Sequence, residues 1–308
     1  QQRGGKVLLI DQVFKYSGWS KELRYCYDHF PDLRIVFSGS SVMRLKEENP
    51  DLAGKVASYN LRGFSFREYL NLVSGNTLPS FSLEDITHHH QEVAEGICSR
   101  VNPLEHFSHY LHHGFYPFFL EKRNFSENLL KTMNMMLEVD VLYIKQIQQT
   151  YLPKLRKLLY LLAVSAPGAP NVSQLSKSIE ASRATVMNYI KYLADARLVN
   201  ILYPQGGTFP KKPCKIYMYN SNLMYPICPV EEVNMDIVRE AFFFNQLQKD
   251  NKVNAGTKNA HFMVNDDYNF KIDSTVRNKT NNGYYYAVDK LAVGKGNQIP
   301  LWLFGFLY

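Results

Sequence analysis

Few cysteines occur in this sequence, and their spacing forms no motif. The chain has 308 residues and four cysteines, which stand far apart at Cys26, Cys98, Cys214 and Cys228. Without a Cys-x-x-Cys pair, neither a zinc framework nor a disulfide scaffold is indicated. We therefore expect reduced and mostly buried thiols, as in a cytoplasmic protein.

Long hydrophobic runs are missing as well. No apolar run reaches the roughly 18 residues that a membrane-spanning helix needs, so no contact with a membrane is expected. The chain opens on a polar stretch at residues 1–6 instead of a signal peptide. Since this stretch has no initial Met, we expect that an upstream part of the protein is not included.

Net charge is present, but it is not concentrated in one region. The formal charge of +7 would allow contact with nucleic acid or with an acidic partner. Lys and Arg are spread along the whole chain, however, so the charge alone favours no partner. With 45% hydrophobic residues over this length, we expect two or three packed cores and several domains.

Two short apolar runs near the N-terminus predict neighbouring parallel strands with a helix between them. The first, KVLLIDQ at residues 6–12, contains Asp11 at its end. The second, RIVF at residues 34–37, is followed by Ser38, Ser40 and Ser41. Because the carboxyl ends of parallel strands share one edge of an open sheet, this acid and these serines could bind the same polyanion.

The order of these segments resembles a known family. LLID, a loop with GW, a helix, FPDLRIVFSGSS and then LRGFSFREYL are similar to the AAA-type P-loop ATPases of bacteria and archaea. The resemblance implies ATP and Mg²⁺ as ligands, with Asp11 holding the magnesium through water. Gln12 stands where the family usually has its catalytic Glu. The strand end that senses the γ-phosphate in the family is matched by Ser38, Ser40 and Ser41.

Two features predict that this chain is inactive as an ATPase. Gln12 can orient a water molecule but cannot accept its proton, so hydrolysis should be slow or absent. The Walker A motif G-x-x-x-x-G-K-[ST], whose amides cradle the phosphates, occurs nowhere in the sequence. In P-loop folds this motif precedes the strand of Asp11, so we do not expect ATP and Mg²⁺ to bind these residues alone. In the simpler alternative, Asp11 only caps the end of a buried strand.

The middle of the chain is predicted to be helical. Residues 81–100 and 103–113 carry apolar side chains at three- and four-residue spacing. His106, His109 and His113 could share one face of the second helix. Since no His-Glu-x-x-His motif accompanies them, we expect solvated or hydrogen-bonded histidines rather than metal ligands.

A winged helix-turn-helix is predicted next. Helical segments at residues 157–163, 172–179 and 182–193 precede strands at residues 196–203 and 215–219, and Ser182 should cap the third helix. This fold binds DNA in some proteins and serves as a plain protein–protein module in others, and both interpretations remain open. If DNA is bound, phosphate contacts would come from Arg183, Lys191, Arg197, Lys211 and Lys212.

The last part of the chain reads as a helix followed by a sheet. A helix is expected over residues 233–250 and strands over residues 260–264, 270–272 and 284–288, and the apolar residues 299–308 should complete a sheet or core. This order resembles the restriction-endonuclease-like domain that ends the same ATPases.

That resemblance implies a metal site that this sequence does not complete. In the family, an acid on the helix, an Asp on one strand and Glu-x-Lys on the next bind a metal and cleave a phosphodiester. Glu240 could be the helix acid, but His261 stands where the Asp is expected and Lys271 where the Glu is expected. Asp266, Asp267 and Asp273 remain as acids of loops or strand edges. We therefore expect a degenerate nuclease fold rather than a nuclease.

Together these segments predict an α/β and α+β multidomain protein. Its parts are the end of an AAA-type domain with a partial P-loop parallel sheet, a helical linker, a winged helix and a degenerate restriction-endonuclease-like domain, at residues 1–75, 76–150, 151–220 and 221–308. One functional hypothesis is an incomplete nucleotide-dependent regulatory ATPase with a protein client. The other is a non-catalytic module that binds nucleic acid or protein. An active nuclease would need acids that the sequence does not supply.

Overall fold

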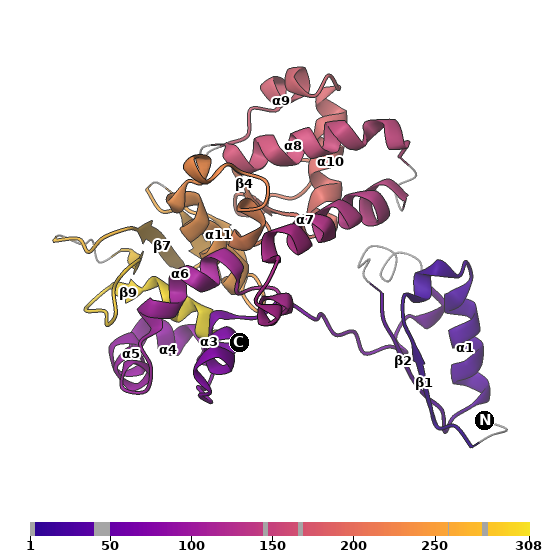
Figure 1. Cartoon of the computed structure of the whole chain (residues 1–308), viewed down its shortest axis with the longest axis horizontal. Coiled ribbons are helices and arrows are strands. Elements are labelled where there is room, and N and C mark those ends of the chain that lie inside the picture. Colours follow the sequence, from indigo (N-terminus) through magenta and orange to yellow (C-terminus); the bar gives the residue numbers. More distant parts are fainter. Residues whose placement is uncertain (1–3, 40–49, 144–146, 166–168, 258, 279–282) are drawn as a thin grey trace.

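A computed structural model describes residues 4–39, 50–143, 147–165, 169–257, 259–278 and 283–308. A small N-terminal unit, coloured indigo, is joined by an extended segment to a larger body that holds the rest of the chain (Figure 1). Within the described ranges, no helix is long and apolar enough to cross a membrane.

The N-terminal unit is built on two parallel strands, as predicted. β1 (Val7–Ile10) pairs with β2 (Arg34–Phe37) along its whole length. α1 (Trp19–His29) buries Trp19 and Leu23 in a small core with partly buried side chains of both strands. β1 is shorter than the predicted residues 6–12 because the chain bends directly after Ile10.

One face of this sheet is bare. Val7, Leu9 and Val36 are 56%, 73% and 59% exposed. Their neighbours along each strand are less exposed, because successive side chains of a strand point to opposite faces. Parallel sheets usually bury both faces under helices. In the described residues, therefore, an apolar surface of the N-terminal unit is left without a covering layer.

Short helices build the first part of the body. They are α3 (Phe66–Ser74), α4 (Leu83–His88), α5 (His90–Cys98), α6 (Pro103–His113), η3 (Pro117–Glu121) and α7 (Phe125–Met135), which continues as the π-helical η4 (Met136–Tyr143). Capping boxes at Ser65 and Ser82 fix the starts of α3 and α4. The single helix predicted over residues 81–100 is two helices, because His89 leaves helical geometry with φ −123° and ψ 17°.

Three helices and a hairpin follow in the predicted order. They are α8 (Leu152–Val164), α9 (Val172–Ser178), α10 (Arg183–Asp195), β3 (Val199–Leu202) and β4 (Lys215–Met218), and a short turn η5 (Gln149–Tyr151) precedes them. The side chain of Ser182 accepts the N–H of Thr185 at 3.0 Å, so the predicted cap of α10 is confirmed. β3 and β4 pair antiparallel.

A five-stranded sheet and one buried helix end the chain. After η6 (Ser221–Met224) and η7 (Val230–Glu232) come α11 (Met235–Leu247), β5 (Val253–Ala255), β6 (Phe262–Val264), β7 (Tyr268–Asp273), β8 (Tyr285–Val288), β9 (Gln298–Pro300) and η8 (Leu301–Phe306). The sheet order is β5-β6-β7-β8-β9, antiparallel up to β7 and parallel from β7 to β9. The helix-then-sheet order is as predicted.

Aromatic packing joins these elements into one core. Phe243 on α11 lies 5.1 Å from the ring centroids of Phe262 and Phe270, and 4.7 Å from that of Phe304 on η8. The apolar C-terminal run is buried, as predicted, and Phe306 packs against Phe66 of α3. One hydrophobic cluster thus runs through the body, and the division at residues 75, 150 and 220 stays a prediction.

Candidate functional site

The carboxyl ends of β1 and β2 bring two of the predicted site residues together. Asp11 follows β1 and Ser38 follows β2, and the Ser38 hydroxyl donates a hydrogen bond to the Asp11 carboxylate. The backbone fixes this contact from both sides, because Ser38 N–H donates to Ile10 C=O at 2.8 Å and Val13 N–H donates to Ser38 C=O at 3.0 Å. The predicted shared edge is therefore formed.

Gln12 adopts an uncommon backbone conformation at this edge. Its φ of 54° lies in the left-handed region, which costs energy for a residue with a side chain. In this conformation its N–H donates to the same Asp11 oxygen at 2.9 Å. Asp11 is exposed, and within the part of the chain that the structure describes its second carboxylate oxygen accepts no hydrogen bond. Ser40 and Ser41 lie outside the described residues.

A second polar cluster surrounds Glu240 inside the body. Glu240 is buried on α11 and accepts hydrogen bonds from the Tyr217 hydroxyl and, at 2.9 Å, from Lys215 Nζ. Lys215 and Tyr217 are two residues apart on β4, so both side chains lie on one side of that strand. Nδ1 of His261 lies 3.4 Å from the carboxylate. The expected helix acid thus has a lysine as a cationic partner.

Burial shapes the protonation of this cluster. It lowers the pKa of His261, which the charges of Lys215 and Lys271 lower further against the opposing effect of Glu240. The imidazole is therefore uncharged at neutral pH, and its Nδ1 accepts the N–H of Ile272 at 3.2 Å. Burial and the Glu240 charge raise the pKa of Tyr217, which keeps its proton for the hydrogen bond.

Other acids of the C-terminal part also hold cations. Arg277 binds Asp273 through Nε at 2.5 Å and Nη2 at 2.6 Å. Arg239 binds Asp289 at 2.7 Å, and Lys252 binds Asp266 at 2.8 Å. In the described residues, no group of three His, Cys, Asp or Glu side chains could hold a metal ion. A predicted Glu position is filled by Lys271, whose ammonium lies 4.4 Å from the Tyr284 ring centroid.

The histidines of α6 contact one another rather than form a ligand set. The rings of His109 and His113 are 5.6 Å apart, and the Nδ1 atoms of His112 and His113 are 3.4 Å apart. Burial lowers the pKa of both His112 and His113. His106 lies on the same helix.

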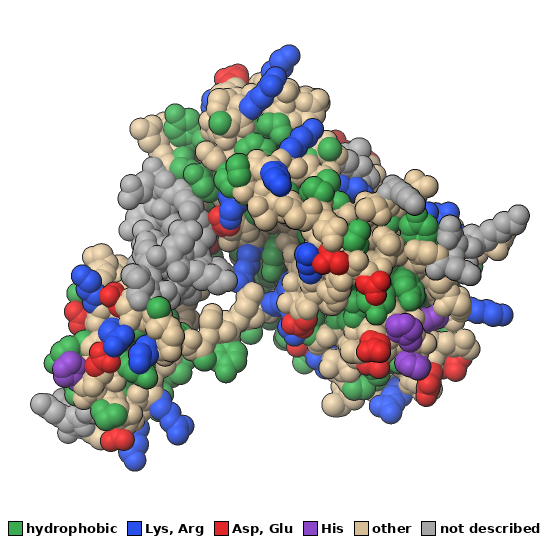
Figure 2. Space-filling view, turned by 180° about the vertical axis from the view of Figure 1, so that it is seen from behind, with side chains coloured by type: hydrophobic (Ala, Val, Ile, Leu, Met, Phe, Trp, Pro, Cys, Tyr) green, Lys and Arg blue, Asp and Glu red, His purple; other side chains and the backbone are tan. Residues whose placement is uncertain are grey.

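The basic residues expected to contact DNA phosphates are placed in different ways. Arg183 and Lys211 are exposed, at the start of α10 and in the hairpin loop. Lys191 pairs with Asp195 one turn along α10. Arg197 donates to Asn60 Oδ1 at 2.6 Å. Lys211 also donates to the Gly206 carbonyl at 3.4 Å, and Lys212 is exposed. Three of these five cations are thus engaged within the chain. Figure 2 shows Lys and Arg scattered over the visible face rather than gathered in one patch.

The hairpin loop is also held by the body. Ala255 N–H of β5 donates to Tyr203 C=O at 2.8 Å, and Gln205 Nε2 donates to Asp266 Oδ1 at 2.9 Å. The hairpin remains a two-stranded sheet of its own, and its loop is fixed to β5 and to the turn between β6 and β7.

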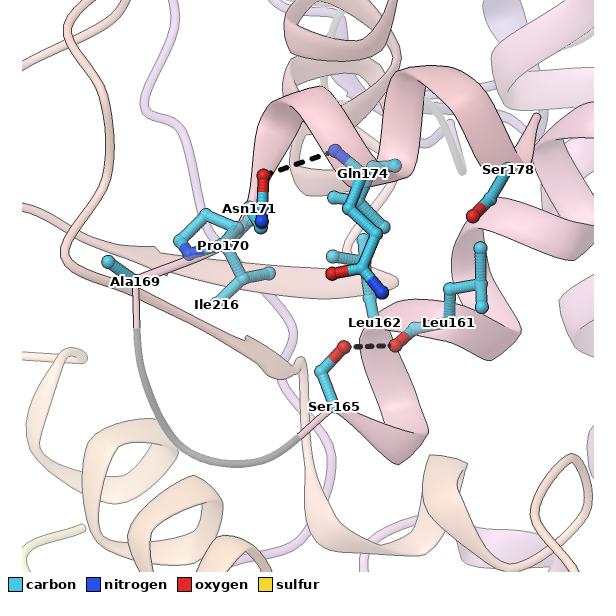
Figure 3. Close-up of a pocket in the computed structure, with 10 residues that line it drawn as sticks. Leu161, Leu162, Ser165, Ala169, Pro170, Asn171, Gln174, Ser178 and Ile216 are labelled. Carbon is cyan, nitrogen blue, oxygen red and sulfur yellow. Dashed lines mark hydrogen bonds between the residues drawn. The ribbon is translucent and has the colours of Figure 1, made fainter. Parts of the chain in front are cut away.

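A pocket of about 220 Å³ lies between α8, α9 and β4 (Figure 3). Its walls combine apolar and uncharged polar side chains, and Figure 3 shows Gln174 and Ser165 on opposite sides of it. The lining residues are Leu161, Leu162, Ser165, Ala169, Pro170, Asn171, Gln174, Leu175, Ser178 and Ile216. None of them titrates near neutral pH or binds metal readily, so the pocket offers no acid–base chemistry.

Two stretches of the chain match known families. Residues 1–70 match the family model described as an AAA domain, and residues 104–231 match one described as a domain of unknown function (DUF8612). No curated protein and no solved structure matches the chain. An AAA-type domain at the N-terminus is therefore supported, and the edge that carries Asp11 and Ser38 lies inside it.

Sequence reasoning found the carboxylate Glu240 but missed its partners. Lys215 and Tyr217 were read only as parts of a returning strand. The available signal was their spacing, since a Lys and a Tyr at positions i and i+2 of a half-buried strand need a polar partner for their buried ends.

Proposed function

We propose that this chain carries the magnesium-binding half of an AAA-type nucleotide site, and that the site, once completed by a glycine-rich phosphate loop, holds ATP without hydrolysing it. The observation that carries the proposal is the hydrogen bond from Ser38 to Asp11 at the carboxyl edge of two parallel strands. That edge belongs to the segment that matches an AAA domain. Ligands of open α/β sheets bind at such an edge.

Each side chain then has a defined task. Asp11 holds the hydrated Mg²⁺ through its exposed oxygen, because a single carboxylate suits an ion that keeps several waters. Ser38, whose hydroxyl donates to Asp11 in this structure, would donate to the γ-phosphate when ATP is bound. Phosphate oxygens and waters would complete the magnesium coordination.

Because of Gln12, the site would bind nucleotide without hydrolysing it. An amide can position the attacking water but cannot take its proton. The left-handed backbone of Gln12 keeps its N–H on Asp11 and so fixes the carboxylate. We infer that occupancy of the site by nucleotide, rather than nucleotide hydrolysis, regulates the body of the protein or a protein client.

The bare face of the sheet supports completion of this site by a further element. Val7, Leu9 and Val36 form an apolar surface beside the edge. A helix packed there would cover it and would aim its N-terminal amides at the phosphates, which is how a glycine-rich loop and its helix bind them. Gly5 and Lys6 do not supply that loop, because Val7 follows where a hydroxyl residue is needed.

The test compares Gln12 and Gln12→Glu in the protein extended upstream to include a glycine-rich phosphate loop. Both versions should bind ATP with Mg²⁺. The rate of ATP hydrolysis should be about a hundredfold higher or more in Gln12→Glu than with Gln12, since that is what a general base contributes. If neither version binds nucleotide, the proposal is wrong.

A second function is favoured by the contacts of the body. Lys191 and Arg197 are engaged within the chain, and Gln205 ties the hairpin loop to Asp266. These contacts favour a protein-binding or purely connecting module over a DNA-binding one. Fluorescence anisotropy with labelled duplex DNA tests it: the protein should bind weakly and without sequence preference, and a sequence-specific complex would contradict it.

A further inference from the structure

The segment that leaves the N-terminal unit runs to the body in extended form. Between η2 (Pro50–Leu52) and α3, residues 56–65 belong to no helix or strand. Tyr59 and Leu61 are 92% and 93% exposed, whereas Asn60 and Arg62 contact the body. This alternation is what extended backbone produces. One side of the segment is therefore docked and the other faces outward. Figure 1 shows the segment as the purple ribbon that joins the two parts.

Two arginines hold the beginning of the docked segment. Arg197, just after α10, donates from Nη2 to Asn60 Oδ1 at 2.6 Å. Arg62 donates from Nη2 to the carbonyl of Asn245 on α11 at 3.0 Å. Both bonds have a charged donor and are stronger than neutral ones. The segment is thereby fixed to two elements that are far apart in the sequence.

At Gly63 the backbone of the segment lies very close to Phe115. A Cβ atom at this position would lie 2.3 Å from a ring carbon of Phe115 and 2.5 Å from the Phe115 carbonyl oxygen. The next residue, Phe64, donates its N–H to that carbonyl at 2.8 Å. Only a glycine allows the backbone to lie so close to this turn.

The end of the segment is hydrogen-bonded to α6 and to the C-terminal residue Tyr308. Tyr110 donates its hydroxyl to the Phe64 carbonyl at 2.7 Å. The carbonyl of Tyr308 accepts hydrogen bonds from Ser65 Oγ and Arg67 Nε, both at 2.9 Å. Polar contacts thus continue from the first anchor to the start of α3.

We infer that residues 60–67 form a strap that fixes the end of the connecting segment to the body near α10 and α11, and that Arg197 is a strap anchor rather than a phosphate contact. Arg197 has a left-handed φ of 59°, which aims its side chain from the end of α10 to Asn60. The inference does not depend on nucleotide binding.

Limited trypsin digestion of the full chain tests the strap, because cleavage after Arg62 requires that its side chain leave Asn245. Asn60→Ala and Arg197→Ala should each raise the initial rate of this cleavage about tenfold, since a charged hydrogen bond contributes about 1.5 kcal/mol or more. The double variant should be no faster than either single one, because both remove the same contact. Cleavage after Lys55, which precedes the strap, should not change.

A second variant perturbs the strap but leaves the hydrogen bond between Arg197 and Asn60 in place. Gly63→Ala should also raise cleavage after Arg62, because the new Cβ collides with Phe115. Gly96→Ala is the matched control, since Gly96 lies on the open face of α5 with nothing within 4 Å of the added atom. That control should leave the cleavage rate unchanged.

Two results would overturn the inference. Unchanged cleavage after Arg62 in Asn60→Ala, Arg197→Ala and Gly63→Ala would mean that the strap is not held by these contacts. Alternatively, Arg197→Ala could weaken binding of labelled duplex DNA without changing cleavage, which would make Arg197 a phosphate contact after all. Asn60 is exposed, so its variant folds and keeps the test decisive.

Discussion

The ammonium of Lys215 on β4 lies 2.9 Å from the carboxylate of Glu240 on α11 and joins the hairpin to the buried helix. Its replacement by Met would leave a buried carboxylate without its cation. We expect Lys215→Met to lower the free energy of unfolding by about 3 kcal/mol. Urea denaturation measures it, with the exposed Lys211→Met as the control that should change little. Equal stability of the two variants would contradict the importance of this pair.

The same pairing predicts how the C-terminal part responds to metal. Lys215, Arg277 and Arg239 occupy the carboxylates of Glu240, Asp273 and Asp289. We therefore expect Mg²⁺, Mn²⁺ or EDTA to leave the thermal unfolding midpoint unchanged, and supercoiled plasmid to stay intact in the presence of these metals. Metal-dependent nicking that disappears in Glu240→Gln would show that the fold is an active nuclease.

Asn222 should be one of the most sensitive positions of the body. It is buried on η6, accepts the N–H of Phe115 at 2.8 Å and donates to the carbonyls of Tyr110 and Leu111, each at 2.9 Å. Asn222→Ala removes all three bonds and leaves the buried N–H of Phe115 without this acceptor, whereas the Tyr110 carbonyl still accepts the N–H of Gly114. The expected loss is about 3 kcal/mol in the free energy of unfolding. The exposed Asn188→Ala on α10 is the control, and a loss as small as in that control would refute the prediction.

Asp140 gives the stability of the fold a pH dependence. It is buried on η4, and its Oδ1 has no hydrogen-bond partner among the described residues. Burial raises the pKa of Asp140 to about 6, whereas the unfolded chain has the ordinary value near 4. Between these values the folded state binds more protons, so stability falls as pH rises from about 4 to about 6 and is then level.

Asp140→Asn removes this titration. The variant should be more stable than the wild type at pH 7, and the difference should shrink as the pH falls towards 4. Thermal melts across this range measure it. A difference that stays constant with pH would mean that Asp140 does not titrate between the two values.

The sequence predicts best where the signal is local. The apolar runs of β1 and β2, each followed by polar residues, predicted a parallel pair and the meeting of Asp11 with Ser38. Ser182 predicted the start of α10, because a serine cap acts on an amide three residues away. In both cases the atoms that decide the outcome lie within a few residues or at equivalent strand ends.

Contacts between distant residues escaped prediction. Nothing near Lys215 indicates that its partner stands 25 residues later on a buried helix. The contact of Arg197 with Asn60 spans 137 residues and engages a cation that the local pattern named as a phosphate contact only if DNA is bound. The break at His89 was also missed, because the apolar spacing of residues 81–100 continues across it. Tertiary packing decides such features, and periodicity does not record it.

The most direct test is the Mg²⁺ dependence of ATP affinity in the protein extended upstream with a glycine-rich phosphate loop. Asp11→Asn is compared with Asp32→Asn, whose carboxylate is exposed before β2 and away from the edge. The account predicts that Mg²⁺ strengthens ATP binding in the wild type and in Asp32→Asn. In Asp11→Asn this gain should be lost, about tenfold or more in Kd, as expected for a charged ligand contact. Equal Mg²⁺ dependence in all three proteins would contradict the central claim.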